Sequence, residues 1–351
     1  MSAPYLSRSS AQKAKAFRTA GGPSIDDLTF DDVDVQAPGP GQVLVAIEAV
    51  SLNFRDLAVV TGRYPRPVSG PTVIASDGCG EVVTVGEGVT IFKPGDRVAG
   101  SFFQKWITGP FVREYGNSAL GGAIDGVLAE QRVFDQEGLV RVPGHMSYQE
   151  GATLPCAGLT AWNALVPTTH VQPGDTVLLL GTGGVSIFGL QFAKLHGARV
   201  IITSSSDEKL ERARALGADE TINYKKNPEW EKEVLRLTGG KGADIVLEVG
   251  GAGTFPQSMS AVRASGQIVV IGVLTGVAGT VPLGLIGLQT LSVRGVYVGS
   301  VAMFEDMNRA MALHGVRPVI DRVFSYEETR DALRCLQSAQ HFGKVVISLE
   351  T

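Results

Sequence analysis

Hydrophobic and polar residues alternate in short runs over the first 145 residues of the chain. Gln42–Val50 is rich in β-branched residues and follows the turn Pro38–Gly41, while Gly80–Gly86 is a second apolar run bounded by glycines. Lys93–Val98 has the pattern of a turn that leads into a strand. Short strands separated by Gly and Pro predict a compact β barrel or sandwich for this part of the chain.

The pattern changes near residue 147. Ser147, with Glu150 three positions later, matches a capping box and predicts a helix that continues to Leu165. Apolar strands then alternate with helices that end at glycines. The expected strands are Asp175–Leu180, Arg199–Thr203, Asp244–Val249 and Gln267–Ile271, and the expected helices are Ser186–His196 and Asp207–Leu216. This alternation predicts a parallel sheet with helices on both faces.

The last 40 residues return to a mixed pattern, with a helix around Tyr326–Ala339 and a final strand at Lys344–Ile347. A length of 351 residues is sufficient for two domains, each with its own core. We therefore predict an α/β protein. A doubly wound domain of residues 146–310 is inserted into a β-rich domain made of residues 1–145 and 311–351.

A glycine-rich segment lies between the strand that ends at Leu180 and the helix that follows it. The first glycine permits a tight turn, the second lets the backbone approach a pyrophosphate, and the helix N-terminus offers free N–H groups. Ser186 stands where a third glycine is usual, and its small side chain is compatible with helix–strand packing. The alternative is a plain glycine-rich turn, but the strand–turn–helix context favours a dinucleotide site. Its candidate ligands are Gly181, Thr182, Gly183, Gly184 and Val185.

The end of the second strand of this domain carries hydroxyl groups where an acid would select NADH. Ser204 and Ser205 can donate hydrogen bonds to a 2′-phosphate, and Lys209 can add a positive charge. Asp207 and Glu208 fall at the start of a helix, where acids commonly interact with the helix dipole. Serines in such loops are also frequent helix caps, but the pattern favours NADPH as the cofactor.

Six motifs together resemble the medium-chain dehydrogenase/reductase superfamily over nearly the whole chain. They are Asn53–Asp56, Lys93–Val98, Gly158–Trp162, Gly181–Ser186, Lys209–Ala218 and Gly343–Val346. The resemblance implies a GroES-like catalytic domain joined to a Rossmann domain, with the active site in the cleft between them. It also implies that Tyr224 contacts the 2′-phosphate, and that Thr160 and Lys344 lie near the cofactor. Tyr224 and Lys344 are otherwise expected to be surface residues.

The resemblance also indicates where the zinc-dependent members of the superfamily hold their metal. The three ligand positions correspond here to Asn53, to the pair Ser76-Asp77 and to Cys156. Catalytic zinc requires three protein ligands from Cys, His or an acid, and only one thiol remains in this set. No cysteine occurs between Lys93 and Asp125 to form a structural zinc site. We therefore expect no zinc, and we expect Cys156 to be a packing residue.

Without a Lewis acid, activated carbonyl compounds are the expected substrates, because a conjugated system spreads the charge that hydride transfer brings. Asn53 is the candidate hydrogen-bond donor beside the nicotinamide and the carbonyl, and Tyr64 is the candidate proton donor. Asp56 is expected to pair with an arginine. We predict reduction of quinones or α,β-unsaturated ketones and aldehydes by NADPH. The alternatives are an alcohol dehydrogenase or aldehyde reductase, and a non-catalytic NADPH-binding protein.

An aromatic stretch follows the Lys93–Val98 segment and has two interpretations of equal weight. It lines an apolar substrate cleft or it forms part of the core. Its members are Phe102, Phe103, Trp106, Phe111 and Tyr115.

Composition limits the partners and the compartment. A formal net charge of −4 gives no basic surface for nucleic acid, and no run of 18 apolar residues is present to span a membrane. The three cysteines are far apart, which favours a reducing compartment and a cytoplasmic protein. The resemblance implies a homodimer that pairs through the last Rossmann strand, for which Leu291–Val298 is the candidate.

Overall fold

A computed structural model describes residues 13–65 and 70–350 of the chain. The chain divides into two compact units. Unit 1 runs to Leu159 and resumes at Gly299, and unit 2 is Thr160–Val298. The expected division lay at residues 145/146 and 310/311. The boundaries differ because helix α2 (Tyr148–Ala152) packs on the strands of unit 1, and helix α9 (Val301–His314) does so as well.

Unit 1 is built on a mainly antiparallel sheet in the order β14-β15-β3-β4-β5-β7, with β6 paired to β3. A separate antiparallel pair is formed by β1 and β2. The bounds are β1 Lys13–Arg18, β2 Thr29–Asp34, β3 Gln42–Ser51, β4 Asp77–Val85, β5 Arg97–Gly100, β6 Gln131–Asp135, β7 Leu139–Arg141, β14 Ile320–Ser325 and β15 Lys344–Ser348. β3 is central and pairs with β4, β6 and β15. At one bulge the strands approach so closely that a Cβ at Gly80 would lie 1.9 Å from the Ala46 carbonyl oxygen.

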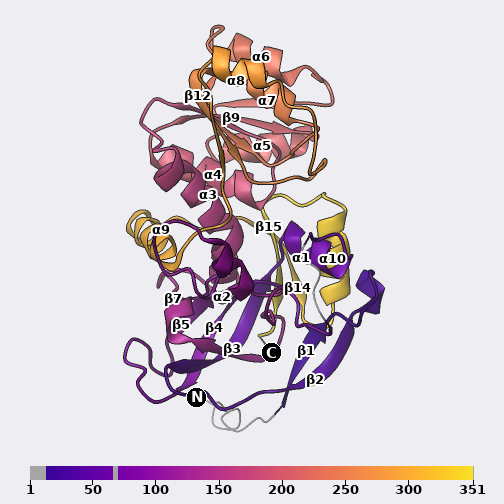
Figure 1. Ribbon diagram of the computed structural model, residues 1–351, viewed down its shortest axis with the longest axis vertical. Coiled ribbons are helices and arrows are strands. Elements are labelled where there is room, and N and C mark those ends of the chain that lie inside the picture. The colour runs from indigo at the N-terminus through magenta and orange to yellow at the C-terminus, as the bar shows by residue number, and fades with distance from the viewer. Residues whose placement is uncertain (1–12, 66–69, 351) are drawn as a thin grey trace. The chain divides into compact units, whose positions relative to one another are not determined.

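The core of unit 1 lies under this sheet and is closed by helix α10 (Thr329–Gln337), which packs on β14 and β15 (Figure 1). The aromatic stretch after β5 divides between core and surface. Phe102, Phe103 and Trp106 are buried, whereas Phe111 is exposed and rests against Trp106 at a ring separation of 5.1 Å. Tyr115 is half-buried and stacks on Trp106. The inner part of this stretch is therefore core.

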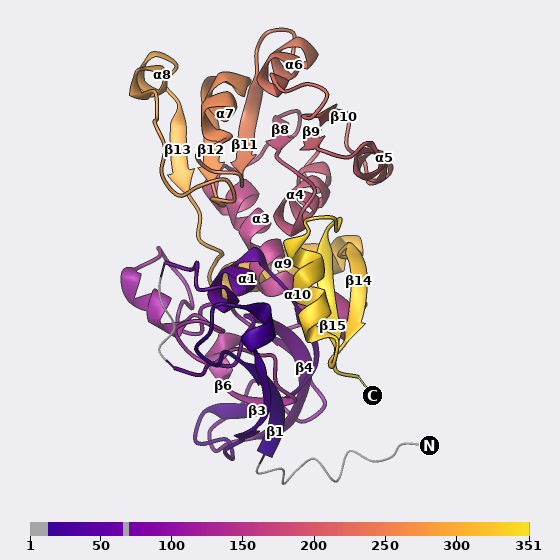
Figure 2. The same ribbon diagram turned by 90° about the vertical axis from the view of Figure 1, so that its right-hand side faces the viewer.

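Unit 2 contains a parallel sheet in the order β10-β9-β8-β11-β12-β13 (Figure 2). This is the doubly wound Rossmann order, in which the direction of winding reverses between β8 and β11. The bounds are β8 Thr176–Leu179, β9 Arg199–Ser204, β10 Glu220–Asn223, β11 Ala243–Glu248, β12 Val262–Val270 and β13 Ser292–Gly295. The α/β class and the two-domain architecture expected from the sequence are confirmed.

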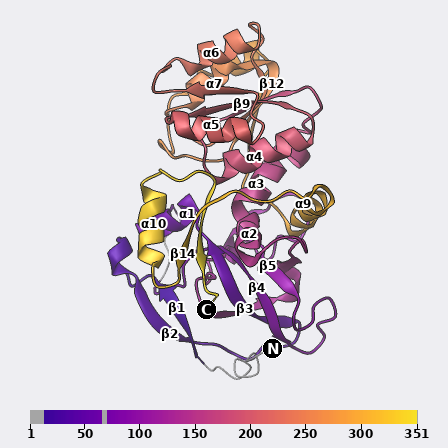
Figure 3. The same ribbon diagram turned by 180° about the vertical axis from the view of Figure 1, so that it is seen from behind.

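Helices cover both faces of this sheet. They are α4 Gly184–Leu195, α5 Asp207–Ala215, α6 Trp230–Leu237, α7 Phe255–Ala261 and α8 Leu283–Leu288. The short helix α3 (Leu159–Asn163) starts at the last residue of unit 1, and its Trp162 ring packs on Phe192 of α4. Figure 3 shows α4 and α5 in front of the sheet. α4 packs closely because a Cβ at Gly189 would lie 3.1 Å from Leu179 and from Leu247. The opposite face carries Leu178, Val246 and the apolar residues of α6 and α7.

The helix expected from Ser147 to Leu165 begins with the predicted capping box, since Ser147 accepts a hydrogen bond from the Glu150 amide. It is not a regular α-helix to its end. Residues 154–158 and 164–168 form π-helical turns on either side of α3. Pro155 and Pro167 lie in these turns, and proline has no N–H to donate within an α-helix.

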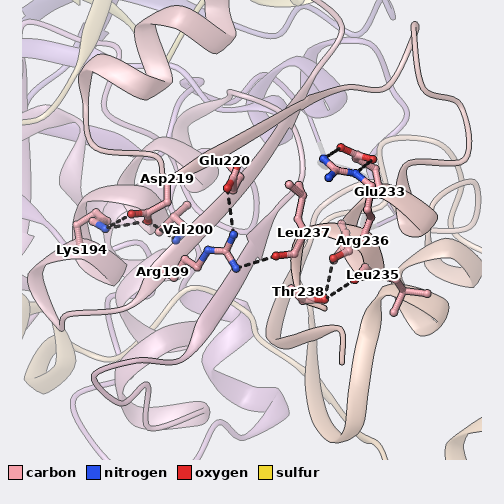
Figure 4. A network of polar contacts seen from close by, with 11 residues as sticks. Lys194, Arg199, Val200, Asp219, Glu220, Glu233, Leu235, Arg236, Leu237 and Thr238 are labelled. Atoms are coloured by element: carbon pink, nitrogen blue, oxygen red, sulfur yellow. Dashed lines mark hydrogen bonds and ion pairs between the residues drawn. The ribbon is translucent and has the colours of Figure 1, made fainter. Parts of the chain in front are cut away.

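A polar network joins strands and helices at the amino ends of β9 and β10 (Figure 4). Asp219 accepts hydrogen bonds from the Lys194 ammonium at 2.8 Å and from the Val200 amide at 2.7 Å. Arg199 donates to the Leu237 carbonyl and to Glu220. Lys194 and the Val200 amide help hold the pKa of Asp219 below its usual range despite its partial burial. Because this network lies at the amino edge, it stabilises the sheet away from the carboxyl edge, where Rossmann folds bind nucleotides.

None of the helices that the structure describes combines the length and apolar character needed to cross a lipid bilayer.

Candidate functional site

The glycine turn between β8 and α4 has the geometry of a phosphate cradle. Gly181 has φ +72°, a left-handed conformation that strongly favours glycine. A Cβ at Gly181 or at Gly183 would meet no described atom within 4 Å, so the backbone is open to close approach from outside. Gly183 is the N-cap of α4, and no side chain caps the helix there. The free N–H groups and the helix dipole therefore suit an anion.

Ser186 explains how the turn does without a third glycine. Its side chain is buried, and its hydroxyl donates to the Leu180 carbonyl at 2.7 Å. The Gly181 amide donates to the Thr203 hydroxyl at 3.1 Å, which ties the turn to the end of β9. Thr182 is buried, while Gly184 and Val185 are half-buried at the start of α4. The five candidate ligands of this turn thus lie together at the carboxyl edge of the sheet.

The hydroxyl-bearing segment and Tyr224 meet at the same edge. β9 and β10 run parallel with Ser204 opposite Asn223, and the Tyr224 amide donates to the Ser204 carbonyl at 3.1 Å. The Tyr224 side chain is 40% exposed, and Ser205 is half-buried. Ser204 itself is buried, with its hydroxyl accepting from the Ser206 amide. Of the two serines, Ser205 is therefore the more accessible to a ligand.

Asp207 is held by neighbouring groups in a way that the sequence did not indicate. Its two carboxylate oxygens accept from the Asn223 amide at 2.7 Å and from the Lys226 ammonium at 2.6 Å. Lys226 and Asn223 lower the pKa of Asp207. The acid that would oppose a 2′-phosphate is thus paired with a cation. Lys209 follows on the first turn of α5, where its amide donates to the N-cap Ser206, and Thr160 is buried in α3.

A second buried carboxylate organises the loop after β11, beside the point where the sheet order reverses. Glu248 is fully buried, and one of its oxygens accepts from the Gly250 amide, the Gly251 amide and the Thr254 hydroxyl at 2.6–2.9 Å. Its other oxygen accepts from Ser258. The loop is thereby fixed next to the glycine turn, since β8 and β11 are neighbours. Sequence reasoning missed this residue, which lies in an apolar run.

The candidate catalytic residues lie in unit 1. Asn53 is the N-cap of helix α1 (Phe54–Val60), and its backbone N–H donates to the Asp56 carboxylate at 2.9 Å. The Arg55 guanidinium lies 3.4 Å from Asp56, so the expected ion pair is present. Burial raises the pKa of Asp56, and Arg55 opposes that effect. The half-buried Tyr64 ring lies 5.4 Å from the Arg55 guanidinium, which places Tyr64 beside this cluster.

Lys344 enters the same cluster from the first position of β15. Its side chain is 3% exposed, and its ammonium donates to the Leu52 carbonyl at 2.7 Å and to Asn53 Oδ1 at 2.6 Å. The chain thus brings together two residues, Asn53 and Lys344, that the resemblance placed near the cofactor. The other expected cofactor ligands lie in unit 2.

Asp77 and Cys156 complete the positions that hold metal in zinc-dependent members of the superfamily. Asp77 is fully buried and accepts from the Ser76 hydroxyl at 2.6 Å and from the Cys156 amide at 2.9 Å. Burial raises the pKa of Asp77 to about 6, although Lys344 opposes the shift. Burial and the Asp77 carboxylate raise the pKa of the Cys156 thiol as well.

These residues do not fit a catalytic zinc ion. A catalytic zinc site needs three protein ligands from Cys, His or an acid, whereas Asn53 and Ser76 supply none, and the amide oxygen of Asn53 is bonded to the Lys344 ammonium. Across residues 13–65 and 70–350, no group of three or more His, Cys, Asp or Glu side chains could hold a metal ion. A protein ammonium therefore stands in this cluster, hydrogen-bonded to the residue at the first ligand position.

Fold and sites together define a two-domain oxidoreductase with a nucleotide-binding unit. The model of the alcohol dehydrogenase GroES-like domain matches residues 39–144, and that of the zinc-binding dehydrogenase matches residues 184–314. A zinc-type alcohol dehydrogenase-like protein of Schizosaccharomyces pombe is 44% identical over 93% of this chain and 96% of its own. The chain belongs to the medium-chain dehydrogenase/reductase superfamily, as the motifs indicated.

Other relatives differ in the activity that their names carry. A quinone oxidoreductase of Pseudomonas aeruginosa is 35% identical over 94% of this chain and 98% of its own. A solved structure of an NAD-dependent alcohol dehydrogenase is 37% identical, with a TM-score of 0.86 over 96% of this chain and 99% of that one. These relatives share the medium-chain dehydrogenase/reductase family with this chain, but their names do not agree on the substrate or the cofactor.

Proposed function

We propose that this enzyme is a zinc-independent, NADPH-dependent reductase of activated carbonyl compounds, either quinones or α,β-unsaturated ketones and aldehydes. The observation that carries the proposal is the Lys344–Asn53 contact of 2.6 Å at the position of the first zinc ligand. This arrangement offers hydrogen-bond donors and a buried positive charge in place of a Lewis acid. The quinone oxidoreductase among the relatives supports the same substrate class.

The glycine turn, Ser205, Lys209 and Tyr224 would hold NADPH, which when bound would supply a hydride to the acceptor and be oxidised to NADP⁺. The acceptor's displaced π electron pair collects on its carbonyl oxygen, and one proton from water or from Tyr64 completes the reduction. The protein's task is to stabilise that developing oxyanion with a fixed donor. Asn53 provides this donor in the proposal. Tyr64 is the candidate proton donor because its ring lies next to Arg55, two residues from Asn53.

The preference for NADPH over NADH rests on the carboxyl edge of the unit 2 sheet. Ser205, Lys209 and Tyr224 surround the end of β9, and Asp207 is paired with Lys226 and Asn223. We expect these groups to favour a 2′-phosphate. The NAD-dependent relative shows that the superfamily also contains the other preference, so the cofactor must be measured.

The test is a steady-state assay with NADPH or NADH, using 1,4-benzoquinone and 2-cyclohexenone as acceptors. The proposal expects turnover of at least one acceptor, a higher kcat/KM with NADPH, and no loss of activity after dialysis against a zinc chelator. Chelator-sensitive oxidation of a simple alcohol with NADP⁺ or NAD⁺ would contradict it. That result would favour the alcohol dehydrogenase alternative, to which the names of two relatives point.

The proposed assembly is a homodimer that joins two unit 2 sheets through β13. This strand is at the edge of its sheet, so its outer hydrogen-bonding groups are open to a second copy. Exposed apolar side chains gather in the surrounding sequence, and such patches usually mark interfaces. They are Leu274, Val277, Val281, Leu283, Leu288, Val293 and Tyr297.

A further inference from the structure

The Lys344 ammonium makes a contact that only one orientation of the Asn53 amide allows. An ammonium has three donors and no acceptor, so its partner must be the amide oxygen and not the amide nitrogen. The ammonium is buried, and its two oxygen partners lie at 2.6 and 2.7 Å, which is the range of charge-assisted hydrogen bonds. Exchanging the oxygen and nitrogen of Asn53 would set two donors against each other.

The backbone around Asn53 is equally fixed. Its N–H donates to Asp56 Oδ2, and its carbonyl accepts from the amides of Asp56 and Leu57. The Leu52 amide donates to the Val345 carbonyl, which ties the start of α1 to β15. Asn53 is therefore held both by the hydrogen bonds of its backbone and by the hydrogen bond to its side-chain oxygen.

The remaining atom, Nδ2 of Asn53, is buried and has no hydrogen-bond partner among the described residues. Leaving such a donor unsatisfied costs about 1–3 kcal/mol, and an orphaned buried group in a native structure calls for an explanation. The nearby Asp77 does not provide one. Its oxygens accept from Ser76 and Cys156. The Asn53 side chain lies close enough to lower the pKa of Asp77, but no hydrogen bond of 3.5 Å or less joins Nδ2 to that carboxylate.

We infer that Lys344 is a positioning residue whose ammonium orients the Asn53 amide, so that Nδ2 donates a hydrogen bond to the carbonyl oxygen of the substrate. The donor is preorganised before the substrate arrives, and its missing partner is the oxygen that becomes negative during hydride transfer. This inference rests on the proposed function, because it gives the substrate oxygen as the ligand. It assigns Lys344 to the substrate side of the reaction and not to the cofactor.

Asn53→Asp isolates the donor. Aspartate keeps an oxygen for Lys344 and is as good a helix N-cap as asparagine, but it has no N–H to offer. We expect kcat/KM for 1,4-benzoquinone to fall about 100-fold or more, with the dissociation constant for NADPH, measured by its fluorescence, changed less than about twofold. Unchanged kcat/KM in a folded Asn53→Asp variant overturns the inference.

Lys344→Met and Lys344→Arg test the positioning. We expect Lys344→Met to lower kcat/KM about tenfold or more, because the amide becomes free to turn, and Lys344→Arg to restore part of the loss. Lys15→Met, which removes a lysine paired with Asp32 on the surface of the same unit, is the matched control and should change kcat/KM less than twofold. A weakened NADPH affinity with an unchanged kcat would instead assign Lys344 to the cofactor and refute the inference.

The double variant Asn53→Asp/Lys344→Met separates positioning from a general structural effect. Once the donor is gone, the loss of Lys344 should lower kcat/KM less than about threefold further. A further loss as large as that of Lys344→Met alone would show that the two residues act independently, and would overturn the inference. If Lys344→Met fails to fold, Lys344→Arg provides the same comparison when it is made in the wild-type enzyme and in the Asn53→Asp variant.

Neutron diffraction of the wild-type enzyme gives a readout that does not depend on turnover. The inference expects the deuterons of the Asn53 side-chain amide on the nitrogen atom, which should face away from Lys344. It also expects that these deuterons make no hydrogen bond to Asp77. Deuterons bonded to Asp77 would overturn it. A wild-type enzyme that reduces no carbonyl compound would refute the proposed function and the assignment of the ligand, while the deuteron positions would still decide whether Lys344 fixes the amide.

Discussion

Asp77 offers the sharpest stability prediction, because the carboxyl is fully buried beside a buried lysine. A pKa of about 6, against 3.8 for an ordinary aspartate, means that the folded state holds its proton more tightly than the unfolded state does. The free energy of unfolding should therefore fall as pH rises from about 4 to 6, and stay low above that range. At about 1.4 kcal/mol per pH unit, the loss is about 3 kcal/mol.

The perturbation is Asp77→Asn, which cannot ionise and can still accept a hydrogen bond from the Cys156 amide. The assay is urea unfolding at pH 4.5 and 7.5, in a Trp162→Phe/Trp230→Phe background where Trp106 reports on unit 1. The stability of wild type relative to Asp77→Asn should drop by about 2 kcal/mol between the two pH values, because part of the loss has already occurred at pH 4.5. Asp31→Asn, which changes an exposed acid of the same unit, is the control and should show a difference below about 0.5 kcal/mol. A pH-independent difference for Asp77→Asn, or one of opposite sign, would refute the reasoning.

Three further predictions concern unit 2. Ser205→Asp should lower the ratio of kcat/KM with NADPH to that with NADH by about tenfold or more, because a carboxylate repels a 2′-phosphate; an unchanged ratio would show that Ser205 does not face the ribose. Glu248→Ala should destabilise the unit by about 3 kcal/mol or more, because it leaves four hydrogen-bond donors without an acceptor. Glu248→Gln should cost less, and equal unfolding midpoints for the two variants would contradict this. Leu288→Glu, at a side chain that is 86% exposed, should weaken the proposed dimer. Native mass spectrometry should then find the 37.0 kDa chain where wild type gives twice that mass, and a monomeric wild type would refute the assembly.

Much of unit 2 could be predicted from the sequence because its signals are local. The strand that ends at Leu180, the left-handed Gly181 and the helix that follows are adjacent in the chain, so their geometry is set by neighbouring residues. The cap at Ser147, which lies in unit 1, has the same local origin. The positions of the two π-helical turns were not predicted, because the helical pattern continues across Pro155 and Pro167.

Pairings between distant segments could not be predicted from local pattern. Glu248 lies in an apolar strand, and its acceptor role is visible only once the loop after β11 folds back over it. The sequence placed Asp207 at the start of a helix, but only the structure shows that its carboxylate is paired with Lys226. In both cases the partners determine the electrostatic effect of the carboxylate.

The sequence by itself determined the two kinds of unit and the glycine turn. Each depends on residue type or on short spacing. Only the tertiary structure decided how the side-chain amide of Asn53 is oriented. Lys344 lies 291 residues away along the chain, and it reaches Asn53 because β15 pairs with β3 and begins beside α1. Sheet pairing depends on the whole core of unit 1, so no local pattern could have revealed which amide atom is left free to donate.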